Sequence, residues 1–568
     1  MSTSQKTKLS AIVFFIAYAF LLEFANEFSK GIEWNFAFFW IAIFGIFTTA
    51  AYQVYHLETS NQRAKLLILS EIISIVLFFG LFRIMLTNQL LPGSDDTYVV
   101  LASTNYIQDH NDFLTTGPLQ NRWPIIQIFG LVISQFGLKL FDIALLFPVF
   151  TKILVILLLY LIASKYYDIK TGLLASLTFA SYYPIWNINS RFRPEILAYI
   201  FFFLLIYMCV MRIRNFSPVA TAFLSILLLL LITMTHYTTN VMMVMFLVSM
   251  SVVFIYAKFR KLPYQPAIQS HITLIMLAIV VMLSYWMYIG EPIFYRLGSS
   301  LVELLKPTTS LTTLEYIRPE PVQLLWLKQK IILYTHDFYF LFFGGLMAYE
   351  IFKQRKCPNW QSDLILTCWA GTVLLLFLLL TEFPGTLYPA RLFIFIYPFV
   401  LIIASHAILK IKSKFNRERL SIILYVLLIG FALLNVFQIT FVPLNPLASV
   451  TYRVASGDGA QEIRAINWIG TSGRNIVAGT RIIHIIGYMK GEETRVSQNI
   501  NLFNGDMNEL RSYSWLYLNP NSPSFLSWSG LIHIGQWLDN ETLVKISNTA
   551  WLQKVYTNGE WEVYRISP

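Results

Sequence analysis

The sequence predicts a polytopic α-helical membrane protein with a small α/β domain at its C-terminal end. Of its 568 residues 56% are hydrophobic and only 13% are charged, about half of the charge that a soluble protein carries. Successive apolar runs reach about 20 residues, the length that crosses a bilayer. After residue 442 these runs shorten and Gly, Asn, Ser and charged residues become frequent, which predicts a soluble segment.

About thirteen membrane spans are predicted from the apolar runs. Their starts lie near Leu9, Trp34, Lys65, Ile143, Thr171, Glu195, Pro218, Thr238, Ser270, Asp337, Asp363, Tyr388 and Leu420. Residues 1–441 are therefore expected to form a transmembrane domain, followed by the soluble domain at 442–568.

The charges of the short loops predict the orientation of the chain. Alternate connections are basic, and the last of them, KIKSKFNRER at 410–419, is the most basic. By the positive-inside rule these loops and the N-terminus are cytoplasmic, and the C-terminal domain is extracytoplasmic. The apolar stretch at 123–137 would invert every later loop if it crossed the membrane, so it is predicted to be an interfacial helix on the outer surface.

The outer face then carries two long loops, at 88–142 and 291–336, and the whole C-terminal domain. Within that domain the stretch 458–470 has helical spacing of its apolar residues. The stretch 552–566 alternates around Asn558-Gly559, a dipeptide typical of a type I′ hairpin turn.

The acidic pair Asp95 and Asp96 is the sharpest candidate for chemistry. It follows the third predicted span and precedes an apolar, helical stretch. Adjacent carboxylates repel each other and are stable beside a cation, a proton or water. The simpler reading, which the pair taken alone favours, is a helix N-terminus at which an acid caps the helix and interacts with its dipole.

Basic residues gather on the same predicted face. Arg191 and Arg193 lie at the outer end of a span, where guanidinium groups match phosphate oxygens, and the alternative is pairing with Glu195 or lipid headgroups. His236 lies between two spans, where capping a helix is the default role and phosphate or metal binding the other. Arg391 lies slightly below the outer surface, and an Arg at membrane depth is a functional candidate.

Several classes of function are excluded by missing motifs. The chain has no P-loop, GxGxxG run, HExxH motif or haem-type Cys motif, which argues against an ATP-driven or redox enzyme. The net charge of +11 is accounted for by cytoplasmic loops, and no nucleic-acid-binding motif accompanies it, so the expected surroundings are the lipid bilayer.

The order of these features resembles that of the GT-C membrane glycosyltransferases, which include protein O-mannosyltransferases and lipid A aminoarabinose transferases. GSDDTYVVLAS at 93–103 resembles the acidic pair of their first outer loop. NRWPIIQIFGLVISQFG at 121–137 is similar to the surface helix that follows, and 165–195 looks like the next stretch, which ends in a Ser-Arg pattern. The likeness covers 85–215 well. Asp-Asp replaces the Asp-Glu of many members, and two extra spans precede the pair.

The resemblance implies a transferase that takes a sugar from a polyprenyl-phosphate-linked donor. The acceptor would be a hydroxyl of a glycan, lipid or protein at the outer face. Asp95 would deprotonate that hydroxyl, which then attacks the anomeric carbon in a single inverting displacement. Asp96 would hold a divalent cation (Mg²⁺ or Mn²⁺) or orient the base, and no other cofactor is expected.

The same resemblance implies that Arg191, Arg193, His236 and Arg391 bind the donor phosphate and stabilise the charge that grows on it as it leaves. Three other functions stay open at this point. The donor could be a pyrophosphate-linked oligosaccharide, as in a ligase or oligosaccharide transferase. The chain could be a lipid-linked sugar flippase or another transporter, although transporters usually show internal repeats and polar groups at the bilayer midplane. It could also be an inactive assembly subunit.

Overall fold

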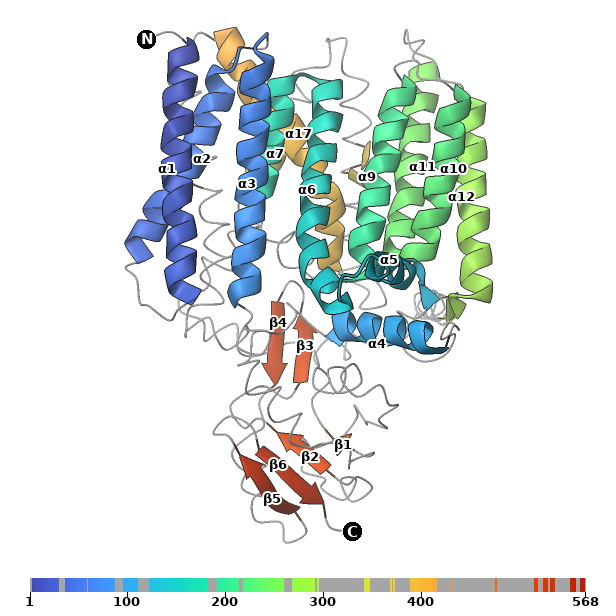
Figure 1. Ribbon diagram of the computed structural model, residues 1–568. Helices are drawn as coiled ribbons and strands as arrows, with labels where there is room; N and C mark the ends of the chain where they lie inside the picture. Colours follow the sequence, from blue (N-terminus) through green and yellow to red (C-terminus); the bar gives the residue numbers. More distant parts are fainter. Residues whose placement is uncertain are drawn as a thin grey trace.

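The protein is a bundle of long helices with β-strands beyond one end of it (Figure 1). A computed structural model describes residues 3–29, 36–58, 60–86, 95–110, 122–181, 192–213, 218–259, 268–291, 294–295, 342–347, 368–369, 371–372, 389–415, 430, 476–477, 515–518, 525–529, 532–536, 552–557 and 562–566.

The predicted spans correspond closely to described helices. The first nine predicted starts, and the one near Tyr388, lie within six residues of a helix start. The helices concerned are α1 (Thr3–Ser29), α2 (Phe36–His56), α3 (Gln62–Leu86), α6 (Leu140–Tyr166), α7 (Ile169–Ala180), α9 (Pro194–Ile213), α10 (Pro218–Thr235), α11 (Tyr237–Phe259), α12 (Ile268–Tyr288) and α17 (Pro389–Phe415).

Five of the described helices are long and apolar enough to cross a membrane. They lie in α1, α2, α3, α6 and α11, and they mark the chain as an integral membrane protein. The predicted total of about thirteen spans is not tested. The predicted starts near Asp337, Asp363 and Leu420 lie outside the described residues, and so do the helix expected at 458–470 and the domain boundary near 441.

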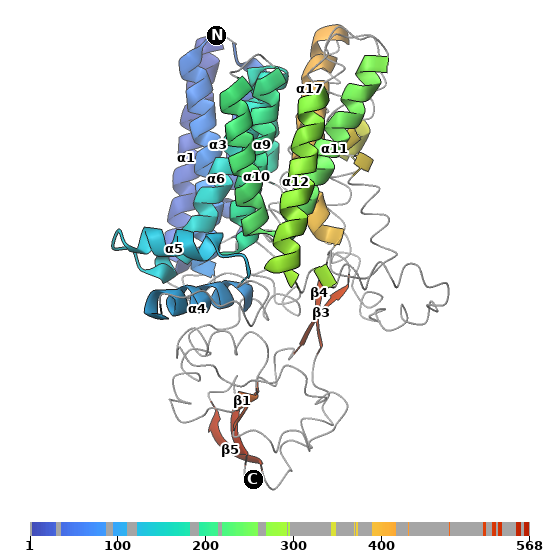
Figure 2. The ribbon, with the colours of Figure 1, turned by 90° about the vertical axis from the view of Figure 1, so that its right-hand side faces the viewer.

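The two ends of the bundle differ in what they carry. The N-terminus lies at one end, whereas α4 (Asp95–His110), α5 (Ile125–Ser134) and the described strands lie at the other (Figures 1 and 2). That the first outer loop and the C-terminal domain lie on the outer side of a membrane, with the N-terminus in the cytoplasm, stays a prediction. We call the end with α4 and α5 the α4–α5 face.

Helix α5 occupies the stretch predicted to be interfacial. It has 10 residues, which at 1.5 Å per residue is about half of the hydrocarbon thickness. Both views show α4 and α5 running across the ends of the long helices rather than along them (Figures 1 and 2). Helix α5 therefore does not run along the bundle as a spanning helix would, and its place on the outer membrane surface stays a prediction.

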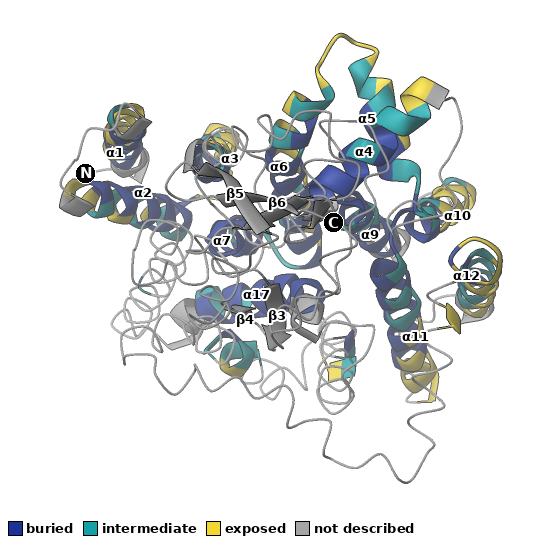
Figure 3. Ribbon diagram, turned by 90° about the horizontal axis from the view of Figure 1, so that it is seen from below, coloured by how far each residue is buried: buried dark blue, intermediate teal, exposed yellow. Residues whose placement is uncertain are grey.

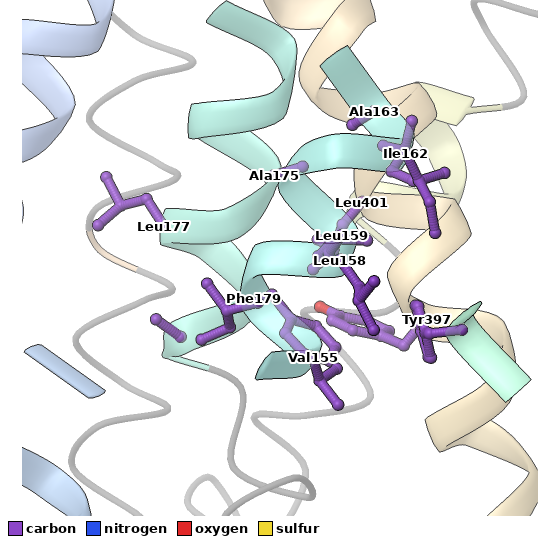
Figure 4. Close-up of a cluster of buried hydrophobic side chains, with 14 of the residues drawn as sticks. Val155, Leu158, Leu159, Ile162, Ala163, Ala175, Leu177, Phe179, Tyr397 and Leu401 are labelled. Carbon is purple, nitrogen blue, oxygen red and sulfur yellow. The ribbon is translucent and has the colours of Figure 1, made fainter. Parts of the chain in front are cut away.

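The core of the bundle is a cluster of aliphatic and aromatic side chains where α6, α7 and α17 meet (Figure 4). Helix α7 begins at a cap, because the Asp168 carboxylate accepts a hydrogen bond from the Thr171 backbone N–H at 2.9 Å. Gly172 follows, and a Cβ there would lie 2.8 Å from the Tyr160 carbonyl oxygen of α6. Glycine thus permits the close approach of these two helices.

The rim of the bundle is apolar and exposed. Seen from the α4–α5 face, α1 and α12 lie at the edge and contain many exposed residues, whereas α7 and α9 lie further inside and are mostly buried (Figure 3). Exposed rim side chains include Phe20, Ile41, Phe150, Phe223 and Met276. A surface of this composition is matched to lipid, since a soluble protein rarely exposes so continuous an apolar area.

The described C-terminal residues form two small sheets. A four-stranded sheet has the order β1 (Ile476–Val477), β2 (Trp515–Leu518), β6 (Glu562–Ile566), β5 (Leu552–Thr557), with only β1 and β2 parallel. The other sheet pairs β3 (Phe525–Ser529) with β4 (Ile532–Gln536). The predicted hairpin is confirmed as β5–β6. Its register pairs Thr557 with Glu562, and the turn itself lies outside the described residues.

One acid lies within a predicted span and is held by a neighbouring helix. The Glu71 carboxylate in α3 accepts hydrogen bonds from Gln53 Nε2 of α2 at 3.0 and 2.9 Å, one to each oxygen. Both side chains are fully buried. An acid inside a membrane bundle is costly unless it is paired, so this contact joins α2 to α3.

Replacing Gln53 with Leu is expected to destabilise the protein by about 1–3 kcal/mol, because Glu71 is left buried without its amide partner. The double variant Gln53→Leu/Glu71→Leu should recover most of that loss, since an apolar pair needs no partner. Thermal unfolding in detergent, measured on both variants, checks this. Equal destabilisation of the single and double variants would contradict the account.

Candidate functional site

The acidic pair Asp95 and Asp96 forms the start of helix α4, on the α4–α5 face. Asp95 is the first residue of the helix and Asp96 the second, so the helix-N-terminus reading of this pair agrees with the backbone. Their side-chain positions lie outside the described residues. The next turn, from Thr97 to Leu101, is buried, which anchors this end of α4 against the bundle.

The start of α9 brings an arginine and a glutamate together. Pro194 is the first helical residue, where its missing N–H costs nothing and its fixed φ favours the helix. Arg193 precedes it and is only 5% exposed. Arg193 Nη1 lies 3.7 Å from Glu195 Oε2. The structure thus contains the ion pair that was the alternative to phosphate binding for this arginine.

His236 lies in the one-residue break between α10 and α11. Its Nδ1 lies 3.0 Å from Thr239 Oγ1 and accepts a hydrogen bond from the Thr239 backbone N–H at 3.4 Å. The imidazole therefore caps α11, as the default reading of this residue expected. Assigned from these bonds, the tautomer that accepts at Nδ1 carries its hydrogen on Nε2.

The Nε2 atom of His236 points at the same glutamate. It lies 3.4 Å from Glu195 Oε1, so Glu195 stands between Arg193 and His236. We call these three residues the Arg193–Glu195–His236 cluster. The starts of α9 and α11 are both turned toward this cluster, and helix N-termini favour negative charge.

Helix α5 connects the cluster to α4. A Cβ on Gly130 of α5 would lie 3.7 Å from Thr104 of α4 and 3.6 Å from the Phe192 ring. Phe192 is the residue before Arg193, and it is fully buried. Because α5 packs against both segments, the acid-bearing helix and the cluster are parts of one assembly on the α4–α5 face.

Residues just before the N-terminal end of α5 contact α12 and the residue that follows it. Arg122 Nη1 donates to the Ile289 carbonyl at 2.9 Å, and Tyr285 Oη donates to the Arg122 carbonyl at 2.7 Å. Trp123 and Trp286 are buried together beside Tyr237, which follows His236. These contacts fix α5 next to the capped end of α11.

The remaining predicted site residues are described less fully. Arg191 lies outside the described residues, and Arg391 is the third residue of α17, with a side chain that is not described. Within the part of the chain that the structure describes, no three His, Cys, Asp or Glu side chains gather in a way that would hold a metal ion. The role of Asp96 as a metal ligand therefore stays a prediction.

Sequence reasoning missed two features of the site. Glu195 was considered only as a simple ion-pair partner, whereas it contacts both Arg193 and His236. The sequence pattern also contains a signal at Arg122 and Trp123, because an arginine and a tryptophan directly before Pro124 are compatible with an anchored helix start. The partners of Arg122, Tyr285 of α12 and Ile289 just after it, lie 163 and 167 residues away, beyond the reach of a local pattern.

No protein-family model matches the sequence, and no curated protein matches it significantly. Among solved structures, ArnT from Cupriavidus metallidurans bound to undecaprenyl phosphate aligns with a TM-score of 0.50 at 13% identity, over 87% of this chain and 97% of ArnT. This likeness shows that the chain shares its overall fold with ArnT.

Oligosaccharyltransferase structures from Archaeoglobus fulgidus also align, with lower scores. The enzyme tethered with an acceptor peptide that contains the NVT sequon has a TM-score of 0.46 at 13% identity, over 79% of this chain and 69% of that one. A complex of the same enzyme with Zn and sulfate has a TM-score of 0.46 at 12% identity, over 78% and 68%.

Glu195→Ala is expected to lower the stability of the protein by about 1–3 kcal/mol, because the buried Arg193 loses its carboxylate partner. Glu195→Gln should cost less, since it keeps a polar oxygen close to both Arg193 and His236. Thermal unfolding measures both, and Glu291→Ala, which removes an exposed acid at the end of α12, serves as control. A Glu195→Ala variant as stable as the control would refute the pairing.

Proposed function

We propose that the protein is a membrane glycosyltransferase. It moves a sugar from a polyprenyl-phosphate-linked donor to an acceptor hydroxyl on the outer face of the membrane. The proposal rests on one packing observation: α5 packs against Thr104 of the acid-bearing helix α4 and against Phe192, the neighbour of Arg193 in the Arg193–Glu195–His236 cluster. The fold is like that of a protein solved with undecaprenyl phosphate.

The donor phosphate needs more positive charge than the described cluster supplies. Arg193 and Glu195 cancel in formal charge, so this ion pair brings no net positive charge to a phosphate. A phosphate that binds here must therefore share Arg193 with Glu195 or recruit other cations. Arg191 and Arg391 are the residues proposed for that role, since an arginine fork matches phosphate oxygens.

Asp95 is the proposed base. As the acceptor oxygen attacks the anomeric carbon, its proton passes to the Asp95 carboxylate. The bond between the anomeric carbon and the phosphate oxygen breaks on the opposite side, and the phosphate leaves with the electron pair, so the configuration inverts. Arg193, together with Arg191 and Arg391, stabilises the charge that develops on the phosphate.

No step is assigned to a metal ion. In the described residues the acids nearest the cluster are not gathered as a ligand set, and Asp96 is proposed to orient the base or to help hold a divalent cation. The orientation proposed from the loop charges places the N-terminus in the cytoplasm and the C-terminal domain outside, beside the acceptor.

Asp95→Asn is expected to lower sugar transfer by a factor of about 10²–10⁴, the usual contribution of a general base. Purified protein would be assayed with radiolabelled polyprenyl-phosphate sugars and a membrane extract as acceptor. Asp109→Asn is the matched control, because it removes an exposed acid near the other end of α4.

Equal transfer by wild type and a folded Asp95→Asn variant would show that the base is wrongly assigned. If the wild type transfers none of a broad donor panel but moves lipid-linked sugars between leaflets of vesicles, the protein is a flippase and the proposal fails.

A further inference from the structure

The turn between α5 and α6 carries an apolar stripe that nothing in the proposed chemistry uses. Ile128, Val132 and Phe136 follow one another at intervals of four residues and are 37%, 48% and 80% exposed. Residues four apart share one face of a helix, so the stripe runs along α5 into the turn. Leu138, 54% exposed, extends it.

The turn between α5 and α6 projects sideways from the bundle. Figure 3, viewed along the bundle, shows this turn beyond the outer edge of α6. Figure 2 shows that it lies at the same height along the bundle as α5. Gly137 has φ of 86°, a conformation that glycine adopts without strain. The reversal at Gly137 leaves Phe136 and Leu138 at the projecting tip.

The stripe continues into a surface that faces lipid. On α6, Leu146, Phe150 and Leu154 are 40%, 56% and 46% exposed. Helix α6 is a candidate membrane span of 27 residues, about 40 Å long, which exceeds the hydrocarbon thickness of about 30 Å. Its first turn, and the tip just before it, therefore lie at the boundary between acyl chains and headgroups.

The charged residues beside Phe136 and Leu138 indicate whether this turn needs anionic lipid. Lys139 and Asp142 are both exposed, and their formal charges cancel. A lysine at this level extends its ammonium group toward the headgroups while its stem stays apolar. Insertion is then driven by the apolar side chains and does not require anionic lipid.

We propose that residues 136–139 form a wedge that inserts into the lipid bilayer at the headgroup boundary. Because α5 packs on Thr104 of α4 and on Phe192 beside Arg193, the wedge sets the depth at which these segments stand in the membrane. The occupant of this surface is lipid, and neither a partner protein nor a second copy of the chain is needed to cover it.

Spin labels test this directly. The label is attached to a cysteine at position 136 in full-length protein whose three native cysteines have been replaced, reconstituted in phosphatidylcholine vesicles. Accessibility to oxygen, which concentrates in lipid, is compared with accessibility to a water-soluble nickel chelate. Asp109→Cys on α4 provides the aqueous reference, and Phe150→Cys on α6 the lipid reference, both at exposed positions.

The label at 136 is expected to favour oxygen over the nickel chelate, as the label at 150 does but at a shallower depth. Adding phosphatidylglycerol to the vesicles should leave the depth unchanged. A label at 136 that behaves like the one at 109 overturns the proposal, because the tip is then in water. A label shielded from both reagents also overturns it, because protein then covers the tip.

Discussion

The cost of placing charge in hydrocarbon is the constraint on which the rest of this structure depends. The described helices are largely apolar, and Glu71, an acid fully buried among them, has both carboxylate oxygens bonded to Gln53. The groups of the candidate site lie at the α4–α5 face, where Arg193 and His236 are buried but each lies beside Glu195. The location of the candidate site follows from this constraint before any catalytic argument is made.

At that face, single residues serve both folding and chemistry. His236 caps α11 with one ring nitrogen and faces Glu195 with the other, and Glu195 also holds Arg193 at the start of α9. The structural alternatives weighed from the sequence, an ion pair for Arg193 and a helix cap for His236, are therefore present. They do not exclude function, because a group held by two contacts is also well oriented for a ligand.

The sequence predicted the helices well because hydropathy and proline positions are local properties. Starts at Pro194, Pro218 and Pro389 coincide with or adjoin the predicted ones, and loop charge identified α5 as a non-spanning helix. The contacts between Arg122 and Ile289 and between His236 and Glu195 could not be predicted, since they depend on how distant helix ends meet. In the β5–β6 hairpin, an irregularity between Lys554 and Tyr556 shifts the register in a way that alternation alone does not reveal.

An anionic lipid phosphate is proposed to bind at the α4–α5 face. The most direct test is to measure the binding of undecaprenyl phosphate to the purified protein. The comparison is between Arg193→Gln and Lys258→Gln, which removes an exposed lysine at the opposite end of α11 from His236. We expect Arg193→Gln, verified as folded by its melting transition, to weaken binding by about tenfold or more, as the loss of a charged hydrogen bond implies. Lys258→Gln should bind like the wild type. Unchanged binding by Arg193→Gln together with weakened binding by Lys258→Gln would place the phosphate at the other face and contradict the account.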